Sequence, residues 1–90
     1  MEEIVKKSIE VIIKSPEGLH LRPASEFVQC ACQYESTIHI EKDGQLVDGK
    51  SMMNLMMLAA VQGTNLILHA EGHDSQDALD ALSSLHSLLR

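Results

Sequence analysis

Polar and apolar residues alternate along three short segments, a pattern typical of strands that bury one face and leave the other in water. The segments cover residues 8–14, 37–42 and 65–71. Their apolar positions on one side are Ile9, Val11 and Ile13, then Ile38 and Ile40, then Leu66, Leu68 and Ala70. The Asp43-Gly44 pair predicts a tight hairpin into a fourth strand at residues 45–48. Clean alternation of this kind favours an antiparallel sheet with one solvated face.

Three further segments place apolar residues at steps of three and four, which predicts helices with one buried side. The first runs from residue 24 to 34, the second begins at Ser51, and the third follows Asp74 or Ser75, either of which can cap it. The apolar stripes of the two longer helices are Ala24, Phe27, Val28, Ala31 and Tyr34, and Ala78, Leu82, Leu85 and Leu89. The order β-α-β-β-α-β-α predicts a two-layer α+β domain with its helices on one face of the sheet. Periodicity does not fix the strand order, and a ferredoxin-like arrangement fits the first six elements equally well.

Length and charge narrow the class of protein. Ninety residues predict a single domain over residues 1–90, too small to spare much core for a deep active-site cavity. The net charge of -6 gives no basic surface for nucleic acid. The longest uninterrupted apolar run, 55–61, is far short of the roughly 20 residues that a membrane span needs. We therefore expect a cytoplasmic monomer that binds neither nucleic acid nor membrane.

The octet GLHLRPAS, residues 18–25, carries the candidate chemistry. Pro23 suits the first turn of a helix, which places His20 at or beside the N-cap. Unpaired backbone N–H groups and the positive end of the helix dipole then lie beside the imidazole, an arrangement that binds anions and phosphate above all. Arg22 adds a planar guanidinium that can grip phosphate oxygens. The combination suits a histidine that carries phosphate, although a histidine before a helix is more often a simple cap or a solvent-facing residue.

The segment GLHLRPASEF closely resembles the active-site signature of the HPr family, the histidine-containing phosphocarriers of the bacterial phosphoenolpyruvate-dependent sugar phosphotransferase system. The resemblance continues through GKSMMNLMMLAAVQGT and AEGHDSQDAL and covers essentially the whole chain. It implies an open-faced β-sandwich with strand order 1-4-2-3. It also implies a carrier with no cofactor and no independent turnover.

By this resemblance, His20 accepts a phosphoryl group on Nδ1 from phosphorylated enzyme I and passes it to an enzyme IIA domain. Arg22 aligns with the arginine that steadies this phosphate. Ser51 aligns with the serine that a dedicated kinase phosphorylates in many Gram-positive bacteria. The family commonly has a small polar residue at the position of Glu17. We expect this acid to repel an incoming phosphate and slow transfer, unless its side chain turns to solvent.

The stretch MMNLMML, residues 52–58, contains one polar residue, so a helix with one face on the sheet must expose several methionines. Leu55 and Leu58 are expected in the core. We expect Met52, Met53 and Met56 to form a partner-binding surface, because an apolar patch left in water usually has a partner and the family binds through this helix.

Two alternatives remain open. A nitrogen-type paralogue would pass phosphate to regulatory proteins and carry no sugar, and its partner distinguishes it. A ferredoxin-like module that binds a small molecule or a metal would need a ligand loop such as Cys-x-x-Cys, which this chain lacks. His39 and His69 fall on the solvated face of neighbouring strands, but two ligands without a third do not make a zinc site, so we expect no metal.

Overall fold

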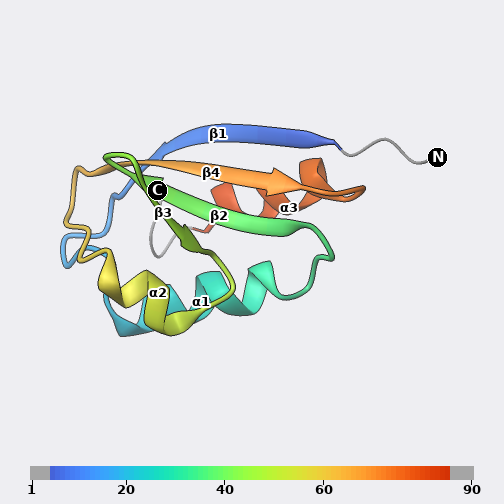
Figure 1. Cartoon of the computed structure of the whole chain (residues 1–90). Coiled ribbons are helices and arrows are strands. Elements are labelled where there is room, and N and C mark those ends of the chain that lie inside the picture. Colours follow the sequence, from blue (N-terminus) through green and yellow to red (C-terminus); the bar gives the residue numbers. More distant parts are fainter. Residues whose placement is uncertain (1–4, 86–90) are drawn as a thin grey trace.

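The seven predicted elements follow one another in the predicted order in the computed structural model, which describes residues 5–85 (Figure 1). The strands are β1 (Lys6–Ile12), β2 (Thr37–Lys42), β3 (Gln45–Asp48) and β4 (Asn65–Glu71). The helices are α1 (Leu21–Ala31), α2 (Met52–Met57) and α3 (Ser75–Ser83).

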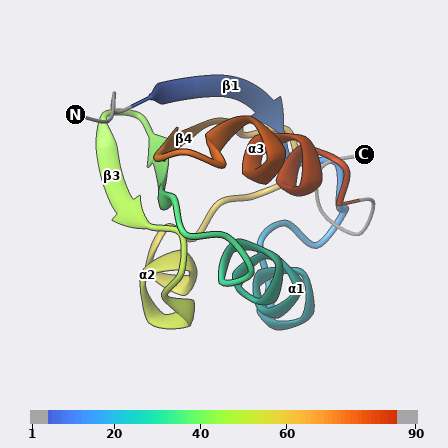
Figure 2. The ribbon, with the colours of Figure 1, turned by 90° about the vertical axis from the view of Figure 1, so that its right-hand side faces the viewer.

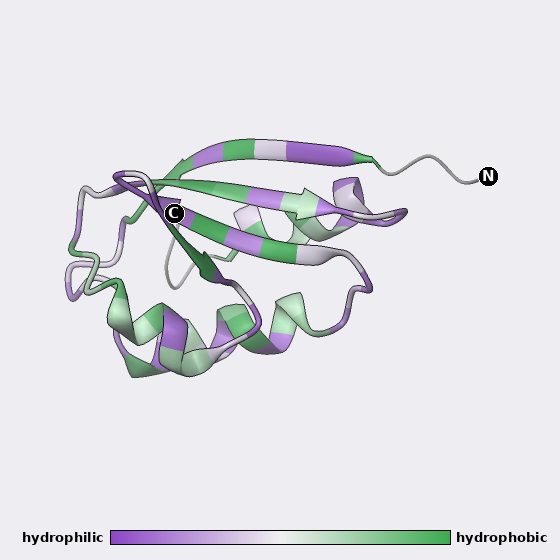
Figure 3. Ribbon diagram, viewed as in Figure 1, coloured by the Kyte–Doolittle hydropathy of each residue, from purple (hydrophilic) through white to green (hydrophobic). Residues whose placement is uncertain are grey.

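The four strands form one antiparallel sheet in the order β1-β4-β2-β3. This is the order that the family resemblance implies, and it removes the ferredoxin-like arrangement that periodicity had left open. Residues directly opposite one another share a face, so the pairing of Ile40 with Leu68 places both toward the helices. His39 pairs with His69 and points with it to the other face. Figure 3 shows the corresponding alternation of apolar and polar residues along β2 and in the second half of β4, which follows a continuous apolar run in that strand.

All three helices cover one face of the sheet and leave the other open (Figure 2). Helix α3 packs against β1 and β4, while α1 contacts both of the other helices. Alternate strand residues and the apolar stripes of the helices meet in one core. Its largest fully buried apolar side chains are Phe27, Ile13, Ile38, Ile40, Leu55, Leu66, Leu68 and Leu82. The two-layer α+β prediction is confirmed.

The boundaries differ from the sequence pattern at the edges of the fold. Strand β1 begins two residues earlier than predicted, at Lys6, which pairs with Glu71. Ile9 lies opposite the buried Leu68, yet 38% of it stays exposed because β1 is an edge strand with a neighbour on one side only. Tyr34 lies beyond the end of α1 but still packs against the core. Leu89 lies outside the described residues.

Local signals set the turns and helix starts. Asp43 and Gly44 both have positive φ angles, 50° and 84°, as a two-residue hairpin of type I′ requires. Ser51 caps α2, and its Oγ accepts a hydrogen bond from the backbone N–H of Asn54 at 3.2 Å. Asp74 occupies the N-cap position of α3 but makes no side-chain cap there.

The carboxylate of Asp74 instead joins α3 to the turn after α1. It accepts hydrogen bonds from the hydroxyl of the buried Ser36 and from the backbone N–H groups of Glu35 and Ser36. These bonds, the Ser36 hydroxyl first and the Glu35 N–H next, lower the pKa of Asp74 to about 2. The acid therefore holds together two segments that are far apart in sequence.

Candidate functional site

The loop before α1 is fixed by backbone contacts at Gly18 and Leu19. A turn closes where the N–H of Gly18 donates to the carbonyl of Ser15 at 3.0 Å. Gly18 has a φ of 73°, and a Cβ atom there would lie 2.5 Å from the carbonyl oxygen of Ala60. The next N–H, of the buried Leu19, donates to the same carbonyl at 2.8 Å. The loop after α2 therefore sets the position at which α1 begins.

His20 is the N-cap residue of α1, in extended conformation with φ -107° and ψ -174°. Its carbonyl accepts the N–H of Ala24 at 3.0 Å, but its imidazole makes no capping hydrogen bond and is 37% exposed. Pro23 stands in the first turn, where its missing N–H costs no intrahelical bond. The backbone N–H groups of Leu21 and Arg22, also in the first turn, have no intrahelical acceptor. The ring therefore stands over a helix end that attracts negative charge.

Two charged groups flank His20. The Glu17 side chain is 76% exposed, and its Oε2 lies 4.0 Å from Nε2 of the imidazole, beyond hydrogen-bond distance but close enough for its charge to act on the ring. Arg22 is 85% exposed and its Nε lies 3.6 Å from Oε1 of Glu26, one helical turn further on. Because exposed pairs of this spacing contribute only about 0.3–0.5 kcal/mol, the guanidinium can leave Glu26 for a stronger anion.

An exposed apolar surface borders the His20 loop. Helix α2 ends beside the start of α1, and Val61 follows the Ala60 carbonyl that holds Leu19 (Figure 1). Of the methionines predicted to bind partners, Met53 is 74% and Met56 is 40% exposed, while Met52 is half-buried and packs against the core. Leu55 and Leu58 are buried, as predicted. We call the exposed residues Leu21, Met53, Met56, Met57 and Val61 the apolar patch.

Ser51 stands at the opposite end of α2 from the residues that touch the His20 loop. Besides the backbone N–H of Asn54, its Oγ accepts the Asn54 side-chain amide at 3.0 Å. The hydroxyl is half-buried and already serves the helix as a cap. A phosphate on this oxygen would sit at the positive end of a short helix.

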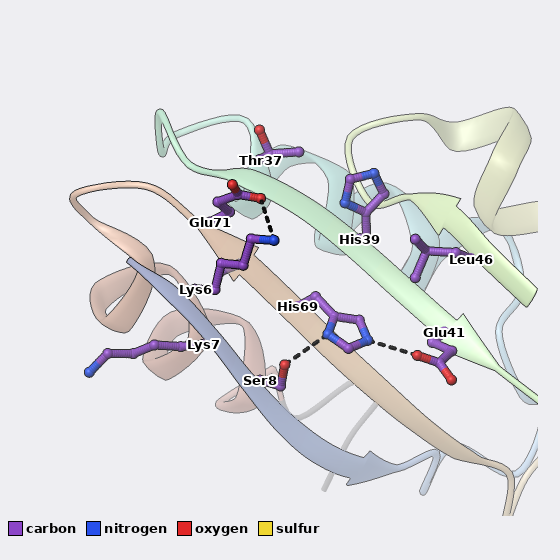
Figure 4. Close-up of a pocket in the computed structure, with 10 residues that line it drawn as sticks. Lys6, Lys7, Ser8, Thr37, His39, Glu41, Leu46, His69 and Glu71 are labelled. Atoms are coloured by element: carbon purple, nitrogen blue, oxygen red, sulfur yellow. Dashed lines mark hydrogen bonds and ion pairs between the residues drawn. The ribbon is translucent and has the colours of Figure 1, made fainter. Parts of the chain in front are cut away.

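A second polar cluster lies on the open face of the sheet, away from His20. Figure 4 shows a groove there in which Ser8, His69 and Glu41 form a chain across β1, β4 and β2. The Ser8 hydroxyl lies 2.8 Å from His69 Nδ1, and His69 Nε2 lies 2.9 Å from Glu41 Oε1. Within residues 5–85, no three His, Cys, Asp or Glu side chains are grouped so as to hold a metal ion. The chain of bonds ties three strands together across their exposed side.

Sequence patterns indicated some of these features and missed others. The exposure of Leu21 and Val61 was not predicted, although each lies within a signature segment. The Ser8 and Glu41 partners of His69 were also missed. The strand order, together with the alternation of side chains between the two faces, could have indicated the Ser8 contact, because it places Ser8 directly opposite His69.

Among residues 5–85, none of the helices has both the length and the apolar character required for a membrane span.

Comparisons with known proteins agree with this geometry. Residues 7–87 match the family model described as the PTS HPr component phosphorylation site. The chain is 48% identical to phosphocarrier protein HPr of Borreliella burgdorferi over 91% of this chain and 93% of that protein. It is also 48% identical to HPr-like protein Crh of Halalkalibacterium halodurans, over 88% and 92% of the two chains. The crystal structure of HPr-C-His from Thermoanaerobacter tengcongensis superposes with a TM-score of 0.85 at 44% identity, covering 88% of this chain and 89% of that one.

Proposed function

Because the chain belongs to the HPr family of phosphocarriers of the phosphotransferase system, we propose that His20 is the residue that carries its phosphoryl group. The observation that carries this proposal is the position of the ring. His20 occupies the N-cap position of an eleven-residue helix, but neither ring nitrogen makes a capping hydrogen bond, and the ring remains partly open to solvent. A nucleophilic nitrogen therefore lies beside the helix end that stabilises an anion.

The chemistry asked of the protein is positioning and electrostatic stabilisation. The family places the phosphoryl group on Nδ1, and transfer runs in line between this nitrogen and a histidine of each partner. The N–H groups at the start of α1 and the guanidinium of Arg22 would bind the phosphate oxygens. The exposed Glu26 contact that Arg22 must give up is weak, which supports its assignment to the phosphate site.

We propose that phosphorylated enzyme I supplies the phosphoryl group and that enzyme IIA domains receive it, both docking on the apolar patch. Met53 and Met56 are exposed enough to serve as anchors, and Met52 would contribute its accessible edge. The carrier would act in the cytoplasm as a monomer. The apparent mass of the native chain in gel filtration tests whether it is a monomer.

We further propose Ser51 as a regulatory phosphorylation site for a dedicated serine kinase. Its hydroxyl caps α2, so a phosphate there would be tolerated by the helix end. The added dianion would stand on the helix that carries Met53 and Met56 and would weaken the docking of an acidic partner surface.

The test of the phosphocarrier function uses purified chain, phosphoenolpyruvate and a bacterial enzyme I, with the phosphate mapped by mass spectrometry. His20 alone should gain an acid-labile, alkali-stable phosphate, and His20→Ala should abolish it. Arg22→Ala should retain the fold but slow transfer in both directions. Label that persists undiminished in His20→Ala would refute the assignment. A parallel reaction uses a nitrogen-type enzyme I in place of the sugar-system enzyme I. The enzyme I that phosphorylates the chain faster shows whether it is a sugar carrier or part of the regulatory relay.

A further inference from the structure

Glu17 lies on a defined side of the His20 ring. The two residues are three apart, and the turn from Ser15 to Gly18 together with the Leu19–Ala60 hydrogen bond fixes the backbone between them. The carboxylate lies 4.0 Å from Nε2, and the imidazole makes no capping hydrogen bond to α1 through either nitrogen. From its position in the sequence, this acid was expected to repel the incoming phosphate, which the family places on Nδ1. In the structure the carboxylate instead lies nearest to Nε2.

A neutral imidazole has one N–H and one lone pair, and the group facing one nitrogen decides which tautomer is present. A carboxylate near Nε2 favours the proton there and leaves the lone pair on Nδ1. At 4.0 Å the carboxylate makes no hydrogen bond to the ring, so this preference comes from its charge alone. We infer that Glu17 is a positioning residue that keeps the proton of His20 on Nε2, so that Nδ1 is ready to accept a phosphoryl group.

This inference rests on the proposed function for its use in transfer. The Nδ1 lone pair forms the new N–P bond as the N–P bond of the donor phosphohistidine breaks and its electron pair returns to the donor's ring nitrogen. No proton has to leave Nδ1, because Nε2 already holds it. The phosphorylated ring then carries positive charge on the side that faces Glu17, which stabilises the product.

The size of the effect follows from exposure. The carboxylate is 76% exposed and the imidazole 37%, so solvent screens their interaction strongly. Exposed pairs of this kind change an equilibrium by about two- to five-fold. We expect a shift of that size both in the tautomer ratio and in the rate of phosphoryl acceptance.

The experiment reads the two quantities separately. Two-bond ¹H–¹⁵N correlation spectra of the ¹⁵N-labelled full chain, recorded at mildly alkaline pH where histidine rings are neutral, give the ratio of the Nε2–H to the Nδ1–H tautomer of His20. Acceptance from phosphorylated enzyme I is measured in parallel. Glu17→Gln keeps the size of the side chain and removes its charge. Glu10→Gln is the matched control, because it makes the same change of net charge on the open face of β1.

Glu17→Gln is expected to lower the tautomer ratio and the acceptance rate by about two- to five-fold each. Glu10→Gln is expected to change neither. An unaltered ratio in Glu17→Gln, an equal change in Glu10→Gln, or a shifted ratio with an unaltered rate would overturn the role of Glu17. Failure of the phosphocarrier proposal is distinguishable, because in that case the wild-type chain gains no phosphate while the tautomer ratio is still measured.

Discussion

Replacing Gly18 with alanine perturbs the junction that positions the start of α1. Two penalties act there. The residue has a φ of 73°, where a side chain costs about 1–2 kcal/mol. Its new Cβ would also lie 2.5 Å from the Ala60 carbonyl oxygen and 2.9 Å from Val61 Cα, both backbone atoms that cannot turn aside. Overpacking of this kind costs about 1–3 kcal/mol, so we expect a total loss of roughly 2–5 kcal/mol.

Gly44→Ala is the control that separates the two penalties. Gly44 has a similar φ of 84°, but nothing lies within 4 Å of the position its Cβ would take. This variant should lose only the backbone term of about 1–2 kcal/mol. Urea unfolding followed by circular dichroism measures both variants against the wild type. The difference of about 1–3 kcal/mol corresponds to at least roughly 4 °C in Tm for a domain of this size.

The site supplies a second readout of the same substitution. Displacing the Ala60 carbonyl breaks its contact with Leu19 and moves His20, so Gly18→Ala should accept phosphate more slowly even where it is fully folded. Gly44→Ala should transfer at the wild-type rate. Equal losses of stability in the two variants would refute the argument that the loop after α2 positions α1.

Three further outcomes are expected. Met53→Glu should weaken enzyme I binding by about 1–3 kcal/mol in calorimetry while Tm barely changes, because the side chain is 74% exposed. The control is Leu46→Glu, which changes an exposed apolar residue on β3 and should leave binding intact. Ser51→Asp should keep its Tm and bind enzyme I more weakly, whereas an unfolded variant or one with wild-type transfer would leave capping as the sole role of Ser51. The pKa of Asp74 is lowered to about 2, so its bonds contribute stability above about pH 4 that is lost as the pH falls toward 2. Asp74→Asn should flatten this acid dependence in urea titrations, and an unchanged pH profile would show that Asp74 contributes nothing to it.

Most of the fold was predictable because each element carries its own periodic signal. The Asp43-Gly44 hairpin and the start of α2 at Ser51 depend on neighbours in sequence, and both occur where they were predicted. The pattern was least informative at β1, where an edge strand buries its inner face incompletely and Ile9 stays exposed. The strand order came from the family resemblance. Alternation shows which face of a strand is buried, but it does not show which strands are neighbours.

The position of His20 was predictable for the same local reason, since Pro23 indicates where the helix begins. The directions of the charged side chains were not. The Arg22 side chain lies beside Glu26, and the Glu17 carboxylate lies 4.0 Å from Nε2 of His20. The Asp74 carboxylate accepts a hydrogen bond from Ser36 instead of capping its own helix. Each choice depends on rotamers and on tertiary neighbours, which residue spacing does not specify.

The hydrogen bond from Leu19 to Ala60 joins residues 41 positions apart, directly beside His20. The His20 ring and the helix end below it are therefore assembled only when α2 and its following loop have docked. An unfolded or newly synthesised chain has the same histidine but neither the fixed ring nor the anion-binding helix end. Under the proposed function, phosphate uptake at His20 should accordingly report the concentration of folded molecules. During refolding, this uptake should appear only after the Leu19–Ala60 contact has formed, and therefore later than the helical signal.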